Sequence, residues 1–159
     1  MAARVQGFTL IELLVVVVIA AVLTGLAVLS LGAWRSADDP EAQLQRFAAL
    51  LEMQCDAALF QSRPRGIRVT AAGYDFWQAV DGGWAPLTGG GVDRPRDWPA
   101  GIQPRLFIEG RRQALDDQDA PPQIVCQPLG ELTAFELELG AGLRLTASAG
   151  GQVAWQRSD

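Results

Sequence analysis

The sequence predicts an α+β fold: a long apolar amino-terminal helix that continues into a second helix, packed on an antiparallel β domain. Three observations predict it. Residues 8–34 are almost continuously apolar, residues from about 40 to 62 carry an apolar stripe with helical spacing, and apolar and polar residues alternate along much of 66–156. We therefore divide the chain into a short leader, a helical segment and a folded domain, at residues 1–7, 8–34 and 35–159.

The apolar block is long enough for a transmembrane helix. A helix needs roughly 20 apolar residues to cross a bilayer core of roughly 30 Å. From Phe8 to Trp34 the apolar run is interrupted only by Thr9, Glu12, Thr24, Gly25, Ser30 and Gly32. Arg4 precedes this run, and a positive charge on the short amino-terminal side favours keeping that end in the cytoplasm. The sequence therefore predicts a single-pass helix with the amino terminus inside and residues 35–159 exported.

Glu12 is the unusual residue of this block. A lone ionisable side chain within a membrane helix costs roughly 3 kcal/mol or more, so it usually has a function. A cleavable secretory signal has an uninterrupted apolar region before its cut site, and a plain membrane anchor has no need of a glutamate. Glu12 therefore argues against both of these interpretations.

The eight residues Gly7-Phe8-Thr9-Leu10-Ile11-Glu12-Leu13-Leu14 resemble the type IV pilin signature, which the pseudopilins of type II secretion share. The resemblance implies that a prepilin peptidase cuts between Gly7 and Phe8 and methylates the new amine of Phe8. It also implies that Glu12 attracts the Phe8 amine of a neighbouring subunit during assembly, because opposite charges offset each other's burial cost in a medium of low dielectric constant. Phe8–Trp34 would then be a transmembrane and assembly helix in the bacterial inner membrane, and the domain would be periplasmic.

A second helix is expected from about residue 40 to 62. Asp39 suits an N-cap position, with Pro40 in the first turn, and Arg63-Pro64 is expected to end the helix. Its apolar stripe consists of Leu44, Phe47, Ala48, Leu51, Cys55, Ala58 and Leu59. This stripe could be a partner interface, but we expect it to pack against the domain's own sheet, which needs a helix to cover it.

The remaining residues are rich in strand patterns. Expected strands cover Gly66–Thr70, Tyr74–Val80, Trp84–Leu87, Ile102–Glu109 and Gln123–Gln127, followed by alternating segments around 135–139, 143–146 and 153–155. Asp81-Gly82-Gly83 is typical of a hairpin turn. Residues 88–100, which are rich in glycine and proline, are expected to form a loop without a core stripe.

Several segments of this domain indicate which group of pilin-like proteins the chain resembles. In chain order they are Gly73–Phe76, Gly83–Leu87, Trp98–Ile102 and Pro128–Phe135, and their order is similar to that of the H-type minor pseudopilins of type II secretion. The resemblance implies a subunit near the pseudopilus tip that assists the export of folded proteins. Its implied partners are the major pseudopilin, the other minor pseudopilins of the tip complex, the prepilin peptidase, the inner-membrane secretion platform and exported cargo. The alternative is a minor pilin of a type IV pilus, acting in priming, twitching or DNA uptake.

Other function classes find little support. The chain has no histidine, so histidine-based catalysis and most zinc or iron sites are excluded, and we expect no enzyme, cofactor or metal. Beyond Arg35 there are 17 acidic and 11 basic residues, a net charge of −6 that disfavours nucleic-acid binding. Asp116, Asp117 and Asp119 lack the spacing of a calcium loop, and Gly89–Gly91 lacks the lysine of a phosphate-binding loop.

The two cysteines, Cys55 and Cys126, are too far apart in sequence for a redox or zinc-binding pair. Cys55 lies on the helical stripe, and Cys126 lies at the end of an expected strand. Export to the periplasm permits a disulfide between them, whereas two separately buried thiols are equally compatible with the sequence.

Overall fold

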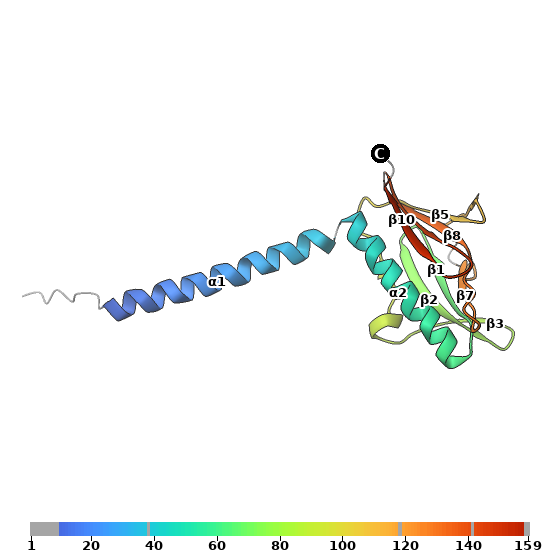
Figure 1. Ribbon diagram of the computed structural model, residues 1–159, viewed down its shortest axis with the longest axis horizontal. Coiled ribbons are helices and arrows are strands. Elements are labelled where there is room, and N and C mark those ends of the chain that lie inside the picture. Colours follow the sequence, from blue (N-terminus) through green and yellow to red (C-terminus); the bar gives the residue numbers. More distant parts are fainter. Residues whose placement is uncertain (1–9, 38, 118, 141, 158–159) are drawn as a thin grey trace, which may run out of the picture. The chain divides into compact units, whose positions relative to one another are not determined.

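A computed structural model describes residues 10–37, 39–117, 119–140 and 142–157 of the chain. The chain divides into two compact units, the first ending at Ala37 and the second beginning at Asp38. The first unit contains helix α1, Leu10–Ala37 (Figure 1). The second unit contains the α-helix α2, a short 3-10 helix and all the strands of the described chain. This arrangement confirms the predicted α+β class.

Helix α2 spans Pro40–Gln61, close to the predicted limits. The side chain of Asp39 caps its amino terminus by accepting a hydrogen bond of 3.1 Å from the backbone N–H of Glu41. The C-cap residue of the helix is Ser62, which adopts a left-handed conformation with φ of 50°. The cap therefore ends the helix just before the Arg63-Pro64 pair that was expected to stop it.

The ten strands found in the described residues form two antiparallel sheets. In the first sheet the order is β3-β2-β1-β7, and β4 also pairs with β2. Its strands are β1 Arg65–Val69, β2 Gly73–Val80, β3 Gly83–Pro86, β4 Arg96–Asp97 and β7 Ile124–Cys126. In the second sheet the order is β10-β9-β8-β5-β6. Its strands are β5 Pro104–Ile108, β6 Arg111–Arg112, β8 Phe135–Leu139, β9 Leu143–Ala147 and β10 Val153–Arg157.

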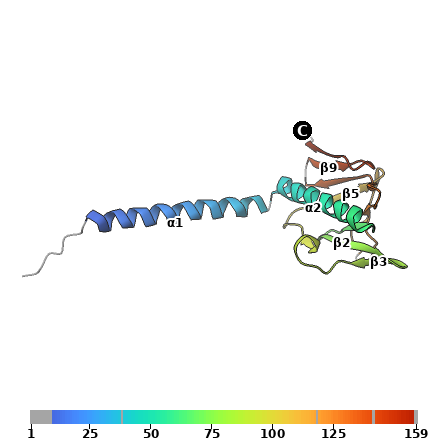
Figure 2. The same ribbon diagram turned by 60° about the horizontal axis from the view of Figure 1, so that its bottom comes forward.

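Helix α2 packs on both sheets, with β1 and β7 from the first and β9 from the second. Figure 2 shows this helix with β5 and β9 on one side and β2 and β3 on the other. The predicted stripe therefore closes the domain's own core. Leu44, Phe47, Leu51 and Ala58 are at most 1% exposed, whereas Leu59, which we had placed in the same stripe, is 51% exposed.

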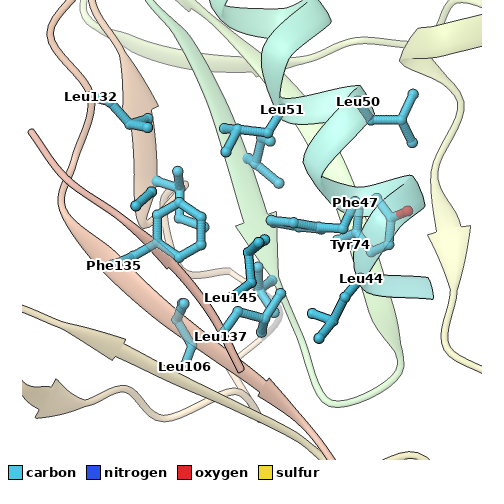
Figure 3. Packing of buried hydrophobic residues seen from close by; sticks show 14 of the residues in the cluster. Leu44, Phe47, Leu50, Leu51, Tyr74, Leu106, Leu132, Phe135, Leu137 and Leu145 are labelled. Carbon is cyan, nitrogen blue, oxygen red and sulfur yellow. The ribbon is translucent and has the colours of Figure 1, made fainter. Parts of the chain in front are cut away.

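Phe47 lies at the centre of the core. Its ring contacts Tyr74 from β2 and Phe135 from β8 edge to face, with centroid separations of 5.0 and 6.1 Å. Figure 3 shows Leu44, Phe47 and Leu51 pointing from α2 toward Leu137 and Leu145 of the second sheet. One continuous apolar cluster thus holds the helix and both sheets together.

The segment 88–100 is more structured than we expected. It contains the short 3-10 helix η1, Gly91–Asp93, as well as β4, and its Trp98 is 7% exposed and belongs to the core. Asp93 forms an ion pair of 3.0 Å with the buried Arg65 on β1. The segment has no core stripe, as expected, but it contributes one core residue and one partly buried ion pair, which leave no periodic pattern in the sequence.

Candidate assembly site

The residues proposed for assembly lie at the start of the chain. Glu12 lies in the first turn of α1, where the positive end of the helix dipole favours a carboxylate. The predicted cleavage position, Gly7 and Phe8, lies outside the described residues. Of the predicted cleavage, methylation and assembly residues, the described part of the chain thus contains only the assembly residue Glu12.

Helix α1 is apolar around its whole circumference. Its large apolar side chains between Leu10 and Leu23 are 46 to 85% exposed. The hydroxyl of Thr24 donates a hydrogen bond of 2.7 Å to the carbonyl oxygen of Ala20, so this polar side chain is satisfied within the helix. A helix that is apolar on all sides requires an apolar environment or neighbouring helices.

Among the described residues, no helix meets both the length and the apolar character required to cross a membrane. The predicted transmembrane segment 8–34 extends beyond the described residues at its amino-terminal end.

The cysteines form a disulfide. Cys55 on α2 is bonded to Cys126 on β7, with their Cα atoms 5.0 Å apart. Of the two alternatives that the sequence left open, the structure thus contains the bonded pair. The bond fastens α2 to the first sheet across 71 positions of sequence, and a loop of this length is expected to contribute about 4 kcal/mol to stability.

The acidic loop and the glycine-rich segment are held by local hydrogen bonds among the described residues. The described residues contain no cluster of three or more side chains able to hold a metal ion. In the acidic loop, the carboxylate of Asp117 instead accepts a hydrogen bond of 2.9 Å from the backbone N–H of Asp119. The glycine-rich segment Gly89–Gly91 leads into η1, where Asp93 is held by Arg65 and Gln54.

The Arg65 cluster was missed by the sequence analysis. Arg65 donates hydrogen bonds of 2.8 Å to Gln54, 3.0 Å to Asp93 and 3.0 Å to Gln61. These residues come from α2, β1 and η1, and no local spacing connects them. A cluster of this kind has a structural role, since it anchors the segment 88–100 to the helix and sheet.

Comparisons with known proteins agree with this arrangement. Residues 2–32 match the family described as the prokaryotic N-terminal methylation motif. Over 143 residues the chain is 32% identical to type II secretion system protein H of Pseudomonas aeruginosa, covering 84% of this chain and 82% of that protein. It is 30% identical over 148 residues to type II secretion system protein H of Aeromonas hydrophila, covering 86% of this chain and 81% of the relative.

This chain belongs to the type II secretion system protein H family. Members of this family are minor pseudopilins, so membership favours type II secretion over the type IV pilus that the sequence had left as an alternative. Together with the methylation motif, it implies a membrane-anchored protein of the cell envelope that has other pseudopilus subunits as its partners.

Solved structures of protein H subunits share the fold. The minor pseudopilin EpsH of Vibrio cholerae superimposes with a TM-score of 0.63 at 20% identity, covering 76% of this chain and 99% of that one. The solution structure of GspH from E. coli gives a TM-score of 0.57 at 22% identity, covering 71% and 84%. The pilin-like arrangement predicted from the sequence is therefore confirmed.

Proposed function

We propose that this protein is a mechanical subunit near the tip of the type II pseudopilus, where it assists the export of folded proteins across the outer membrane. The observation that carries this proposal is the coincidence, within one short segment, of the methylation motif, an apolar helix and Glu12 in the helix's first turn. The subunit would perform no catalysis. Its helix would bundle with other helices, and its β domain would present side chains to neighbours and cargo.

In this proposal the prepilin peptidase removes residues 1–7 and methylates the amine of Phe8. The mature helix, residues 8–34, then spans the inner membrane with its amino terminus toward the cytoplasm. The domain of residues 35–159 lies in the periplasm, where the disulfide between Cys55 and Cys126 is chemically stable.

The proposed role of Glu12 is to pair with the Phe8 amine of an adjacent subunit. A carboxylate and an ammonium group that are buried together offset most of each other's desolvation cost, whereas either alone is strongly unfavourable. Such a pair would set the axial register between neighbouring helices. Its partners would be the major pseudopilin and the minor pseudopilins of the tip complex, brought together at the inner-membrane secretion platform.

The test is a strain that lacks this protein. We expect exported proteins to accumulate in the periplasm while twitching motility stays normal, and we expect the wild-type chain to restore export. Loss of twitching with normal secretion would contradict the proposal and would support a pilus function.

The processing step has a separate test. Mass spectrometry of the protein purified from membranes should show a chain that begins at methylated Phe8. A chain that begins at Met1, or one cut near Ala33, would exclude processing by a prepilin peptidase. Replacing Gly7 by a bulkier residue should leave the leader attached, because the extended backbone could not enter a tight peptidase cleft.

A further inference from the structure

The outer strands of the two sheets, which include the two-residue strand β4, differ in how they are protected. Unpaired strand edges bind other chains unless proline, charge, short length or a covering segment prevents it. In the first sheet, β3 ends in Pro86, and β7 is three residues long and continues through a bridge between Cys126 and Leu132. In the second sheet, β6 consists of Arg111 and Arg112 only. Strand β10 is the exception: it is five residues long and has no proline, and in the described chain it pairs with β9 alone.

The side chains of β10 extend the core-facing surface of the second sheet. Val153 is opposite Ala147 and Trp155 is opposite Leu145 in the antiparallel register, so each pair points to the same face of the sheet. Leu145 and Ala147 are buried beneath α2, at 0 and 6% exposure, but Val153 and Trp155 are 39 and 45% exposed. The apolar face therefore continues beyond the area that the helix covers.

Some backbone N–H and C=O groups of β10 also point toward the edge of the second sheet, away from β9. The N–H of Ser148 donates to the carbonyl oxygen of Gln152 at 2.9 Å, so these two residues form a hydrogen-bonded pair. Because such pairs alternate along an antiparallel ladder, Val153 and Trp155 occupy positions that are not bonded to β9. Their N–H and C=O groups face away from the sheet. Within the described residues, these two residues thus present both backbone groups that no strand pairs with and exposed apolar side chains.

These side chains line a groove of about 560 Å³ between β10 and α2. Its apolar lining includes Leu51, Leu59 and Leu132. Glu52 and Asp56 also line the groove; they are one turn apart on α2 and form no ion pair within the described residues. The site therefore combines a strand edge, an apolar surface and negative charge.

We infer that this groove, with the edge of β10, binds an extended segment of a partner protein, which adds to the second sheet as a further strand. The segment carries apolar side chains together with arginine or lysine on the face that points into the groove. Strand addition satisfies the backbone groups of Val153 and Trp155, which a docked helix would leave unpaired. The basic side chains pair with Glu52 and Asp56.

A second copy of this chain does not fit the same requirements. Each copy would bring another Glu52 and Asp56 to the contact, and the residues beyond Arg35 carry a net charge of −6. Like charges placed together at an interface are unfavourable. The inferred partner is therefore a different, basic segment. The inference is separate from the position of this subunit in the filament.

The probe is a synthetic peptide matched to β10 in length, with valine and arginine at the groove-facing positions and threonine between them. We expect it to bind the full-length protein in detergent micelles and to slow the amide hydrogen exchange of Val153 and Trp155. One control peptide is N-methylated on alternate backbone amides, which prevents strand pairing but keeps the side chains. A second control has glutamate in place of arginine. Both controls should bind about tenfold more weakly, as expected for lost hydrogen bonds or ion pairs.

Matched variants of the protein sharpen the test. Val153→Pro removes an N–H that faces the open edge and leaves the bonds to β9 in place, so it should weaken peptide binding about tenfold. Val153→Thr keeps that N–H and should change binding less than about twofold. Equal binding of the plain and N-methylated peptides would overturn strand addition. Absence of binding by any of the peptides, unchanged exchange at β10, or a dimer of the protein formed through β10 would also overturn the inference.

Discussion

In α1, the large apolar side chains between Leu10 and Leu23 are 46 to 85% exposed, while in the second unit Phe47, Phe76 and Leu137 are completely buried. Both units contain many leucines, but they use their apolar residues differently. The second unit folds them into its own core, which the disulfide fastens further. Helix α1 cannot bury its apolar surface within a single helix, because all its sides carry apolar residues.

This difference indicates that α1 serves assembly, whereas the apolar residues of the second unit serve its folding. Changes in α1 are expected to alter how the chain associates and leave the stability of the second unit unchanged. Changes in the core should lower the free energy of unfolding of the second unit, because replacing a buried residue leaves a cavity in the packed interior. The following four predictions test this separation, in order of decreasing expected effect.

The largest effect is expected for Glu12→Leu. If the carboxylate pairs with a neighbouring amine, its removal leaves an unpaired buried charge that costs about 5 kcal/mol, enough to reduce incorporation into the filament at least about a thousandfold. Secretion assays and crosslinking of filaments would measure this loss. Thr24→Val on the same helix removes only the bond to Ala20 and should secrete normally. Equal secretion by both variants would contradict the proposed role of Glu12.

Removal of the disulfide should destabilise the second unit alone. Replacing both Cys55 and Cys126 by alanine is expected to lower the free energy of unfolding by about 4 kcal/mol, because the unfolded chain regains the freedom of a long loop. Urea denaturation would measure the change. Met53→Ala, at an exposed position of the same helix, should cost less than about 0.5 kcal/mol and serves as the control. If the double alanine variant and Met53→Ala lowered the free energy of unfolding by similar amounts, the disulfide would add little to stability.

Two phenylalanines of α2 sharpen the contrast within one helix. Phe47→Ala should cost about 4 kcal/mol, since it opens a cavity between Tyr74 and Phe135. Phe60 is 84% exposed, so Phe60→Ala should change stability by less than about 0.5 kcal/mol. Thermal melts of the two variants, followed by circular dichroism, provide the comparison. If Phe60→Ala were as destabilising as Phe47→Ala, the described core would be wrong.

The smallest effect concerns Tyr74, the single tyrosine of the sequence. Burial raises the pKa of its hydroxyl above the ordinary value of 10.0, while Arg46 and Arg96 act in the opposite direction. Because the folded-state pKa is the higher one, the folded state keeps the proton longer. The associated stability is fully present below about pH 10 and is lost as the pH rises through the folded-state pKa. Ultraviolet absorbance of tyrosinate would follow this titration directly.

Tyr74→Phe is the matched variant for this titration. The hydroxyl oxygen is buried and makes no hydrogen bond within the described residues, so its removal at neutral pH should change stability by less than about 1 kcal/mol. The variant should also lose part of the alkaline decline in stability. Titration of Tyr74 at its ordinary pKa in the folded protein would show that the hydroxyl reaches solvent.

Periodic patterns predicted most of the elements. The stripe that begins at Leu44 predicted α2, and the alternation through Phe135, Leu137 and Leu139 predicted β8, because helices and strands repeat their buried positions at fixed spacings. The short strands β4 and β6 were missed, since two residues are too few to show a period. The exposure of the edge strand was also missed, because Val153 and Trp155 alternate like core residues but are 39 and 45% exposed in the structure.

The sequence by itself determined the two α-helices and the order of the longer strands, the candidate processing site at Gly7 and Phe8, and Glu12 within an apolar helix, because each depends on residues that are close along the chain. Only the tertiary structure decided that Cys55 meets Cys126, that Asp93 holds Arg65, and that β10 leaves an open apolar edge beside α2. These features join residues that are distant in sequence. They depend on how the helix and two sheets pack, and packing is set by the whole core and by no local pattern.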